Sequence, residues 1–457
     1  MITESTPNAA PSKFDFHSYL LDLTGHKWTI QELAGGYANH TVRALRTPEI
    51  ALREPAQGAS DRDDAGYMNG YTSVVLKQAP PYFAKIPDLP FSQDRQVSLL
   101  VFNTYWCRSY AMMLQTIEAN ALSLFHTPPS SGAATTLSPV LHSNPSIRVP
   151  YFLHHDLTKQ VLIQSDLGKH SELNKFLTST NTTPALASSA GASLGCFLKD
   201  LHGAFDDASN VIKEGLCRTF ANDEGEAVLC KTIAGMLDYM KDAGVEDYVL
   251  LEKRAQDNWT SRRRTVFGQG DIWFGTVLVD IKDGEVEVGI CDWEFAGFNH
   301  PAGDISQLGQ DAYFYVTKQA VTDIIDDAPS HAGSYLHLAS MSPLTTPLSQ
   351  NNLQSFSSAF YSSYLSPSFS SAYLRAEFQR NLVIMHAWEM INAAAWRHYI
   401  WCDCPGKDVK CNHIADMIRV GARLLRAAGD ADKDRTIRDI DWDALKDIDW
   451  CVFLRLK

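Results

Sequence analysis

Two aspartates, Asp271 and Asp292, have the residue type and the spacing that acid–base and metal chemistry need. Asp271 lies just before an apolar run at 277–280, and Asp292 ends the next apolar run, at 286–291. A Lys-Asp-Gly turn separates the two runs, so we predict a β-hairpin that brings the two carboxylates side by side. Such a pair suits phosphoryl transfer, in which one aspartate orients and deprotonates a hydroxyl and another holds Mg²⁺ on nucleotide phosphates.

The chain before residue 166 has the pattern of a mainly β region. Short runs rich in Val, Ile, Thr and Tyr alternate with turn residues, and Pro80 and Pro81 end one run because proline cannot continue a strand ladder. The predicted strands are 28–33, 41–45, 71–77, 151–154 and 160–164, with a helix at 104–125 and loops at 54–69 and 126–146.

Helical periodicity dominates after residue 168. In the segment 185–202, Leu194, Phe197, Leu198 and Leu201 form one apolar stripe, which predicts an amphipathic helix. Further helices are expected at 372–400 and 412–428, preceded by a Ser/Pro-rich stretch at 328–370. We therefore predict an α+β fold class with three parts: a flexible tail at 1–13, a β-rich N-terminal lobe at 14–165 and a mainly helical C-terminal lobe at 166–457.

Composition excludes several classes of partner. A net charge of −13 disfavours a nucleic acid or an anionic membrane surface as the partner. No stretch approaches the roughly 18 consecutive apolar residues of a spanning helix, and no secretory signal is visible at the N-terminus. The nine cysteines are odd in number and scattered, which fits reduced thiols. We expect a cytoplasmic protein that does not bind membranes; the sequence says nothing about its oligomeric state.

The chain resembles the aminoglycoside phosphotransferase and choline kinase-like family, which are small-molecule relatives of the protein kinases. The resemblance rests on Gln269-Gly270-Asp271 followed by Thr276, on Asp292-Trp293-Glu294, and on Gly297 and 301–304. The segment 76–82 is similar to methylthioribose kinases in particular. The resemblance implies a bilobal protein-kinase-like fold, ATP and Mg²⁺ as cofactors, and a small-molecule hydroxyl as the acceptor.

The resemblance also implies a role for each site residue. Asp271 would accept the proton of the substrate hydroxyl, and Asp292 would bind Mg²⁺ together with Thr276. Glu294 either touches a second metal ion or caps the strand. The phosphate side of the nucleotide site would be formed by Lys77, which Glu118 would orient as an ion pair, and by the turn at Gly35 and Gly36, whereas backbone groups of Gln164, Ser165 and Asp166 would bind the adenine edge.

Two positions depart from the family pattern and keep a second hypothesis open. Gln269 stands where the family has histidine, and Thr276 stands where it has a metal-binding asparagine. An amide can hydrogen-bond backbone as the histidine does, but a threonine hydroxyl is a weaker, neutral ligand. The alternative to an active kinase is therefore a catalytically impaired, pseudokinase-like binding module. A protein kinase is disfavoured, because no Ala-Pro-Glu segment follows Asp292.

Two further groups of residues near the C-terminus have open interpretations. Cys402, Cys404, Cys411 and His413 either bind zinc or lie in a loop as reduced thiols, and their spacing fits common zinc sites poorly. Trp388, Trp396 and Trp401 either line an acceptor pocket or pack in a core. The aromatic content suggests an aromatic acceptor, whereas the methylthioribose kinase resemblance suggests a sugar-like alcohol.

Overall fold

The computed structural model of this chain describes residues 14–33, 39–47, 68, 70–80, 104–128, 136–261, 264–308, 347–365, 372–396, 412–429 and 440–441. Contacts between residues divide the chain into a first unit, 1–115 with 151–168, and a second unit, 116–150 with 169–457. The predicted tail at 1–13, the Gly35–Gly36 turn and most of the predicted loop at 54–69 lie outside the described residues.

The first unit is built on a five-stranded antiparallel sheet in the order β1-β2-β3-β6-β5. Its elements are α1 (Phe16–Thr24), β1 (Trp28–Glu32), β2 (His40–Arg46), β3 (Ser73–Gln78), β5 (Phe152–Asp156) and β6 (Val161–Ser165). Strand β3 lies in the centre of the sheet, and its Val74 and Leu76 are fully buried in a cluster with Leu20 and Trp28. All five predicted strands are confirmed, because β-branched and aromatic runs pack well on a pleated, half-buried surface.

Helix α2 (Thr104–His126) confirms the helix predicted after β3. The predicted loop at 126–146 was partly wrong, because it contains the short helix α3 (Ser138–Ser143). Leu137 and Val140 are buried and anchor this helix. Pro139 stands in its first turn, where the missing backbone N–H removes no helical hydrogen bond.

The described part of the second unit contains two small sheets. The larger has the order β4-β10-β9-β7, in which the antiparallel hairpin of β9 (Val277–Lys282) and β10 (Glu285–Ile290) pairs with β4 (Ile147–Arg148) and β7 (Ser171–Glu172). The smaller joins β8 (Val266–Gly268) to β11 (Gly297–Asn299). The predicted hairpin between the two aspartates is therefore confirmed. Its turn contains Asp283 and Gly284, which both have positive φ angles.

The other regular elements described in the second unit are helices. They are α4 (Leu173–Thr178), α5 (Pro184–Gly203), α6 (Asn210–Thr219), α7 (Asp223–Asp242), α8 (Tyr248–Ser261), the short 3₁₀ helix η2 (Trp293–Phe295), α11 (Pro347–Tyr364), α12 (Ala372–Trp396) and α14 (Asn412–Ala427), and residues 302–308 are also helical. Among the described residues, no helix combines the length and the apolar character that crossing a membrane requires. The predicted α+β class, β-rich first and mainly helical afterwards, is confirmed.

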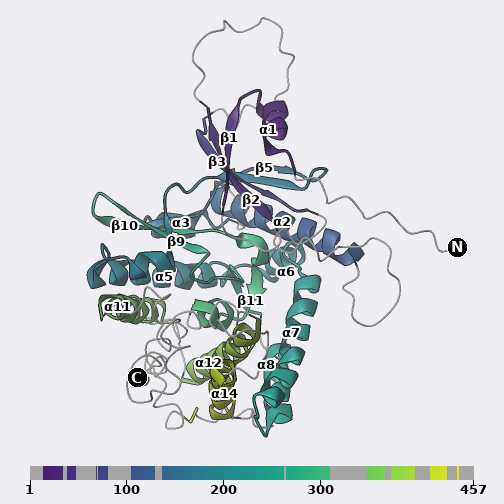
Figure 1. Cartoon of the computed structure of the whole chain (residues 1–457), viewed down its shortest axis with the longest axis vertical. Coiled ribbons are helices and arrows are strands. Elements are labelled where there is room, and N and C mark those ends of the chain that lie inside the picture. The colour runs from purple at the N-terminus through teal and green to yellow at the C-terminus, as the bar shows by residue number, and fades with distance from the viewer. Residues whose placement is uncertain are drawn as a thin grey trace, which may run out of the picture. The chain divides into compact units, whose positions relative to one another are not determined.

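Helix α11 lies in the Ser/Pro-rich stretch that we did not predict to be helical. Among its serines stand four apolar residues whose spacing fits one face of a helix. All four are buried: Leu353, Phe356, Phe360 and Tyr364. Figure 1 shows α11 running beside α5, and these two helices pack against each other. The stripe was missed because serine composition outweighed the spacing of the apolar residues.

Glycines allow α5 and α11 to approach closely. A Cβ atom on Gly191 would overlap the backbone carbonyl of Phe356, and one on Gly195 would overlap that of Phe360. Because both obstacles are backbone atoms within a helix, neither can turn aside as a side chain could. The absence of a side chain at these two positions is therefore a condition of this packing.

We predict opposite effects for the same substitution at two helical glycines. Gly191→Ala would force α5 and α11 apart and lower the free energy of unfolding by about 1–3 kcal/mol. Gly215→Ala, on α6, meets no atom within 4 Å and would raise it by about 0.5–1 kcal/mol, because alanine favours the helix. Urea unfolding of both variants measures the two changes in the free energy of unfolding. Equal effects of the two substitutions would contradict this account of the helix contact.

Candidate active site

The two predicted aspartates lie in loops that flank the β9–β10 hairpin. Asp271 lies in the loop between β8 and β9, and Asp292 follows β10 directly. Gly270, with a φ of 88°, lets the first loop pass close to Phe295, whose carbonyl oxygen a Cβ atom would overlap. Asp292 itself has a left-handed backbone with a φ of 67°. The chain reverses sharply at both positions.

The side chain of Gln269 connects the two loops. Its Oε1 accepts the backbone N–H of Asp271 at 2.7 Å, while its Nε2 donates to the carbonyl oxygens of Cys291 at 3.2 Å and Asp292 at 2.6 Å. Gln269 is fully buried, so these hydrogen bonds are shielded from water. The amide therefore ties the backbone at Asp271 to the backbone at Asp292.

A buried carboxylate, that of Asp304, holds the backbone of the Asp271 loop. Its Oδ2 accepts the N–H of Gln269 at 3.0 Å, and its Oδ1 accepts the N–H of Gly270 at 2.7 Å. His202, on α5, donates from Nε2 to Oδ2 at 3.1 Å, because a carboxylate can only accept. Asp304 is 2% exposed, so these donors supply the hydrogen bonds that a buried carboxylate needs.

Tyr364, on α11, continues this network. Its hydroxyl lies 2.8 Å from Nδ1 of His202. Burial and the nearby charge of Asp304 raise the pKa of Tyr364, so the hydroxyl stays protonated. We predicted no role for Asp304, His202 or Tyr364 from the sequence. Asp304 was noted only as part of the family-like segment 301–304, and no local signal linked it to His202 or Tyr364.

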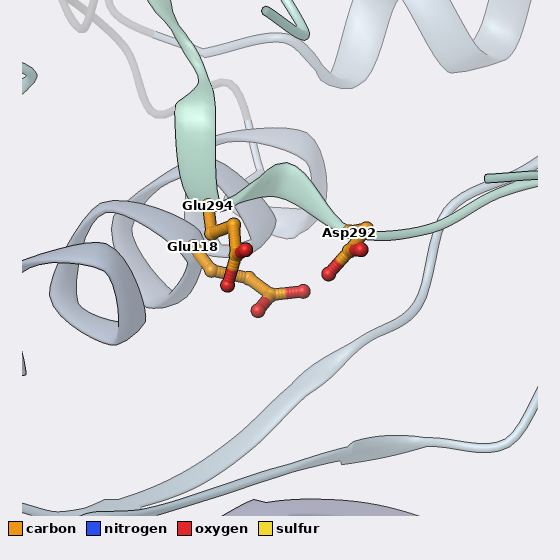
Figure 2. A group of neighbouring side chains, drawn as sticks. All are labelled: Glu118, Asp292 and Glu294. Carbon is orange, nitrogen blue, oxygen red and sulfur yellow. The ribbon is translucent and has the colours of Figure 1, made fainter. Parts of the chain in front are cut away.

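Three carboxylates gather at Asp292. Figure 2 shows Glu118 of α2, Asp292 and Glu294 directed towards one another, and a ligand oxygen from each lies within 4.8 Å of the others. Glu118 is fully buried, and its Oε1 accepts the N–H of Trp293 at 3.4 Å. Carboxylate oxygens are the ligands that Mg²⁺ prefers, so the donor chemistry of this cluster fits the predicted metal ion.

Thr276 lies inside the Asp271 loop. Its hydroxyl accepts the N–H of Trp273 at 3.0 Å and lies 3.0 Å from the carbonyl oxygen of Trp273 and 3.3 Å from that of Asp271. The residue is 2% exposed. These contacts show a hydroxyl that closes the turn before β9. Its predicted role as a metal ligand stays a prediction.

All the predicted nucleotide-binding residues that the structure describes, except Glu118, lie in the first unit. Lys77 is 5% exposed on β3 and its carbonyl oxygen accepts from Gln115. The Oγ atom of Ser165 accepts a hydrogen bond from the backbone N–H of Tyr151 at 2.8 Å. Gln164, next to it on β6, is also buried, at 3% exposed. Glu118 belongs to the second unit, so the predicted Lys77–Glu118 ion pair stays a prediction.

Asp166 is engaged by side chains of the first unit. Arg43, on β2, contacts both of its carboxylate oxygens, at 2.8 and 2.9 Å, and Ser73 donates a further hydrogen bond. Arg43 also donates to the carbonyl oxygen of Gly168 at 2.6 Å. This cluster fixes the segment that follows β6, where the adenine edge is predicted to bind.

The predictions for the two groups near the C-terminus, the cysteines with His413 and the tryptophans, have different outcomes. Cys402, Cys404 and Cys411 lie outside the described residues, as does the side chain of His413, so the zinc alternative stays open. Trp388 is 3% exposed and packs edge-to-face on Trp259 with ring centroids 5.8 Å apart, which fits a core residue. The side chains of Trp396 and Trp401 are not among those described.

Comparisons with known proteins give two related sequences and several distant structures. No family model matches the chain. The chain is 22% identical over 290 residues to the 4-hydroxytryptamine kinase of Psilocybe cyanescens and 23% identical over 298 residues to that of Psilocybe cubensis. Each match covers 62% of this chain and 67% of the relative. The predicted resemblance to small-molecule kinases is confirmed by these relatives.

Two solved structures illustrate the distant structural likeness. An ethanolamine kinase from Plasmodium vivax has a TM-score of 0.39 and 11% identity, with 88% of this chain and 83% of that chain covered. The GDP and kanamycin complex of an APH(2″) enzyme has a TM-score of 0.38 and 10% identity, with 90% and 97% covered. Such scores are too low for an inference about activity.

We predict that His386, on α12, makes stability depend on pH. Its Nδ1 donates to the carbonyl oxygen of Ser306 at 3.0 Å, and burial lowers its pKa to about 4. An unfolded histidine titrates near about 6.5, so the unfolded chain binds the proton more readily below that pH. The free energy of unfolding should therefore fall as pH drops, by about 2 kcal/mol from this group between pH 7 and pH 5.

His386→Gln separates this contribution from those of the carboxylates, because a glutamine can donate to Ser306 without titrating. Urea unfolding at pH 7 and pH 5 should give the variant a shallower pH dependence than wild type. His142→Gln, at an exposed histidine on α3, serves as the control. An unchanged pH dependence in His386→Gln would contradict the prediction.

Proposed function

We propose that this chain is an ATP- and Mg²⁺-dependent phosphotransferase that phosphorylates a hydroxyl of a small-molecule metabolite. The observation that carries the proposal is the Gln269 amide, which bonds the backbone of Asp271 on one side and that of Asp292 on the other. It fixes the backbone positions from which a base and a metal ligand act together. The two related 4-hydroxytryptamine kinases support the same class of reaction.

Asp271 is the group that would accept the proton of the acceptor hydroxyl. It is half-buried, and Gln307 donates to its Oδ1 at 2.9 Å, so the carboxylate has a set orientation. Phosphoryl transfer asks little covalent chemistry of the protein, and most of the rate comes from placing the hydroxyl in line with the phosphorus. A loop whose backbone is held at Gln269 and Gly270 by Asp304 suits that task.

Asp292, Glu294 and Glu118 are the residues that would hold Mg²⁺. Their oxygens lie close together, and two unit charges at 4.8 Å repel by about 3 kcal/mol at an effective dielectric constant of about 20. A cation between them would turn this repulsion into attraction. When bound, the ion would neutralise charge on the nucleotide phosphates. In this proposal the carboxylates supply the charged ligands, and Thr276, whose hydroxyl also shapes the loop, keeps its predicted role as a neutral ligand.

The nucleotide side of the proposal rests on the first unit. Lys77 would contact the phosphates, and the segment 164–166 would border the adenine. Gly35 and Gly36 complete the predicted phosphate turn. Lysine provides a point charge that suits phosphate oxygens.

We propose that the acceptor class to test first is an aromatic compound that carries a hydroxyl on its ring and also an amine. 4-Hydroxytryptamine carries an aromatic hydroxyl and an amine, and the two relatives are named for it. This choice favours the aromatic alternative over the sugar-like alcohol. Incubation with labelled ATP and a metabolite extract, followed by mass analysis of new phosphorylated species, covers acceptors outside this class.

The impaired, pseudokinase-like alternative is carried by Gln269 and Thr276. Against it, Gln269 makes three hydrogen bonds that organise the site, so replacing histidine has not left the loop unsupported. Stabilisation by ATP and Mg²⁺ without any phosphorylated product would favour the binding module. Product formation would exclude it.

We predict that Asp271→Asn lowers turnover by about 10²- to 10⁴-fold while nucleotide binding persists, because an amide cannot accept the proton. Turnover is measured as ADP and phosphorylated 4-hydroxytryptamine, and binding as the rise in melting temperature with ATP and Mg²⁺. Asp283→Asn, in the exposed turn of the β9–β10 hairpin, is the matched control. Turnover of Asp271→Asn within a few-fold of wild type would sink the assignment of the base.

We predict that Asp292→Asn weakens metal binding at least about tenfold, because it removes one charge from the carboxylate cluster. Asparagine tolerates the left-handed backbone of this position, so the fold should be kept. Mn²⁺ binding in the presence of ATP, followed by electron paramagnetic resonance, measures the affinity directly. Asp280→Asn on β9 is the control, and equal Mn²⁺ affinities of the two variants would exclude the cluster as the metal site.

A further inference from the structure

We propose that Gln307 is a positioning residue for the Asp271 carboxylate; this inference rests on the proposed function. Residues 302–308 form one helical segment, in which Asp304 and Gln307 stand one turn apart. Asp304 holds the backbone N–H groups of Gln269 and Gly270, and Gln307 donates from Nε2 to Oδ1 of Asp271 at 2.9 Å. A single turn of helix thus fixes both the loop and the side chain that the loop presents.

The hydrogen bond to Asp271 also settles how the amide of Gln307 is oriented. A carboxylate oxygen only accepts, so the NH₂ group must face it, and the reverse orientation would place two oxygens in contact. Oε1 of Gln307 is then directed away, and within the part of the chain that the structure describes it is buried without a hydrogen-bond partner. A buried acceptor without a partner lowers stability, and native structures keep few of them. Gln307 is therefore poorly explained by stability alone.

The amide of Gln307 is uncharged, and this matters because its neighbour Asp271 is the proposed base. A lysine or arginine at this position would orient Asp271 but would also offset the negative charge that must attract the proton. A glutamate at this position would repel the carboxylate of Asp271. Glutamine donates one hydrogen bond and carries no net charge, so it restricts the rotamer of Asp271 without placing a charge beside it.

If Gln307 positions Asp271, its substitution should lower turnover without lowering stability. Gln307→Leu keeps the approximate volume and removes both the hydrogen bond to Asp271 and the buried oxygen. Its melting temperature should equal or exceed that of wild type, while kcat falls about 10- to 100-fold and KM for ATP stays within about twofold. A residue with a purely structural role would show the reverse: a lower melting temperature and an unchanged kcat of the folded protein.

The test measures ADP formation from ATP and Mg²⁺ in the presence of 4-hydroxytryptamine, which records transfer to the acceptor and to water alike. The variants are Gln307→Leu, Gln307→Glu, Asp271→Asn and the double variant Asp271→Asn/Gln307→Leu, with Gln354→Leu on the exposed side of α11 as the control. Gln307→Glu, which keeps the shape and reverses the interaction, should be slower than Gln307→Leu. It also serves as the second variant if Gln307→Leu does not fold.

The double variant is the decisive comparison. If Gln307 acts through Asp271, adding Gln307→Leu to Asp271→Asn should change the residual rate by less than about twofold. Independent, multiplicative losses would overturn the proposal, as would a kcat of Gln307→Leu within about twofold of wild type. Wild-type protein that forms no ADP with either 4-hydroxytryptamine or a metabolite extract would instead refute the proposed phosphotransferase itself, and this inference with it.

Discussion

The carboxylate of Asp304 is the constraint on which the site depends. The segment between β8 and β9 has no regular secondary structure, so the N–H groups of Gln269 and Gly270 need acceptors that are not in a ladder. Asp304 supplies one oxygen to each, and hydrogen bonds to a charged acceptor contribute about 2 kcal/mol apiece. The loop is therefore held to the helical segment at 302–308.

The same carboxylate requires support of its own, which links the site to the helical part of the second unit. His202 of α5 donates to it, and Tyr364 of α11 contacts His202 in turn. Since α5 and α11 meet closely only because Gly191 and Gly195 lack side chains, their packing helps to place Tyr364 against His202. The geometry around Gln269 thus depends on helix packing as well as on local loop chemistry.

Elements with a local signal could be predicted from the sequence, and elements that depend on distant partners could not. The strands of the first unit, the β9–β10 hairpin and α5 each carry their own periodicity or turn residues. Helix α11 was missed because its apolar stripe is diluted by serines, and α3 because it is a single short segment. Asp271, Asp292 and Gln269 were found through a resemblance and their spacing in the chain. Asp304 and Gln307 were given no role, because their importance lies in contacts with residues more than 30 positions away.

Trp293 explains how Asp292 can keep a strained conformation. A left-handed backbone at a residue other than glycine is unfavourable by about 1–2 kcal/mol, so neighbouring contacts must compensate for it. Trp293 is fully buried, packs on Phe125 with ring centroids 4.6 Å apart, and donates from Nε1 to the carbonyl oxygen of Ile290 at 3.0 Å. Its backbone N–H meets Glu118. Because one aromatic anchor fixes the residue after Asp292 and its backbone N–H faces the carboxylate of Glu118 on α2, packing in the core helps to hold Asp292 close to Glu118.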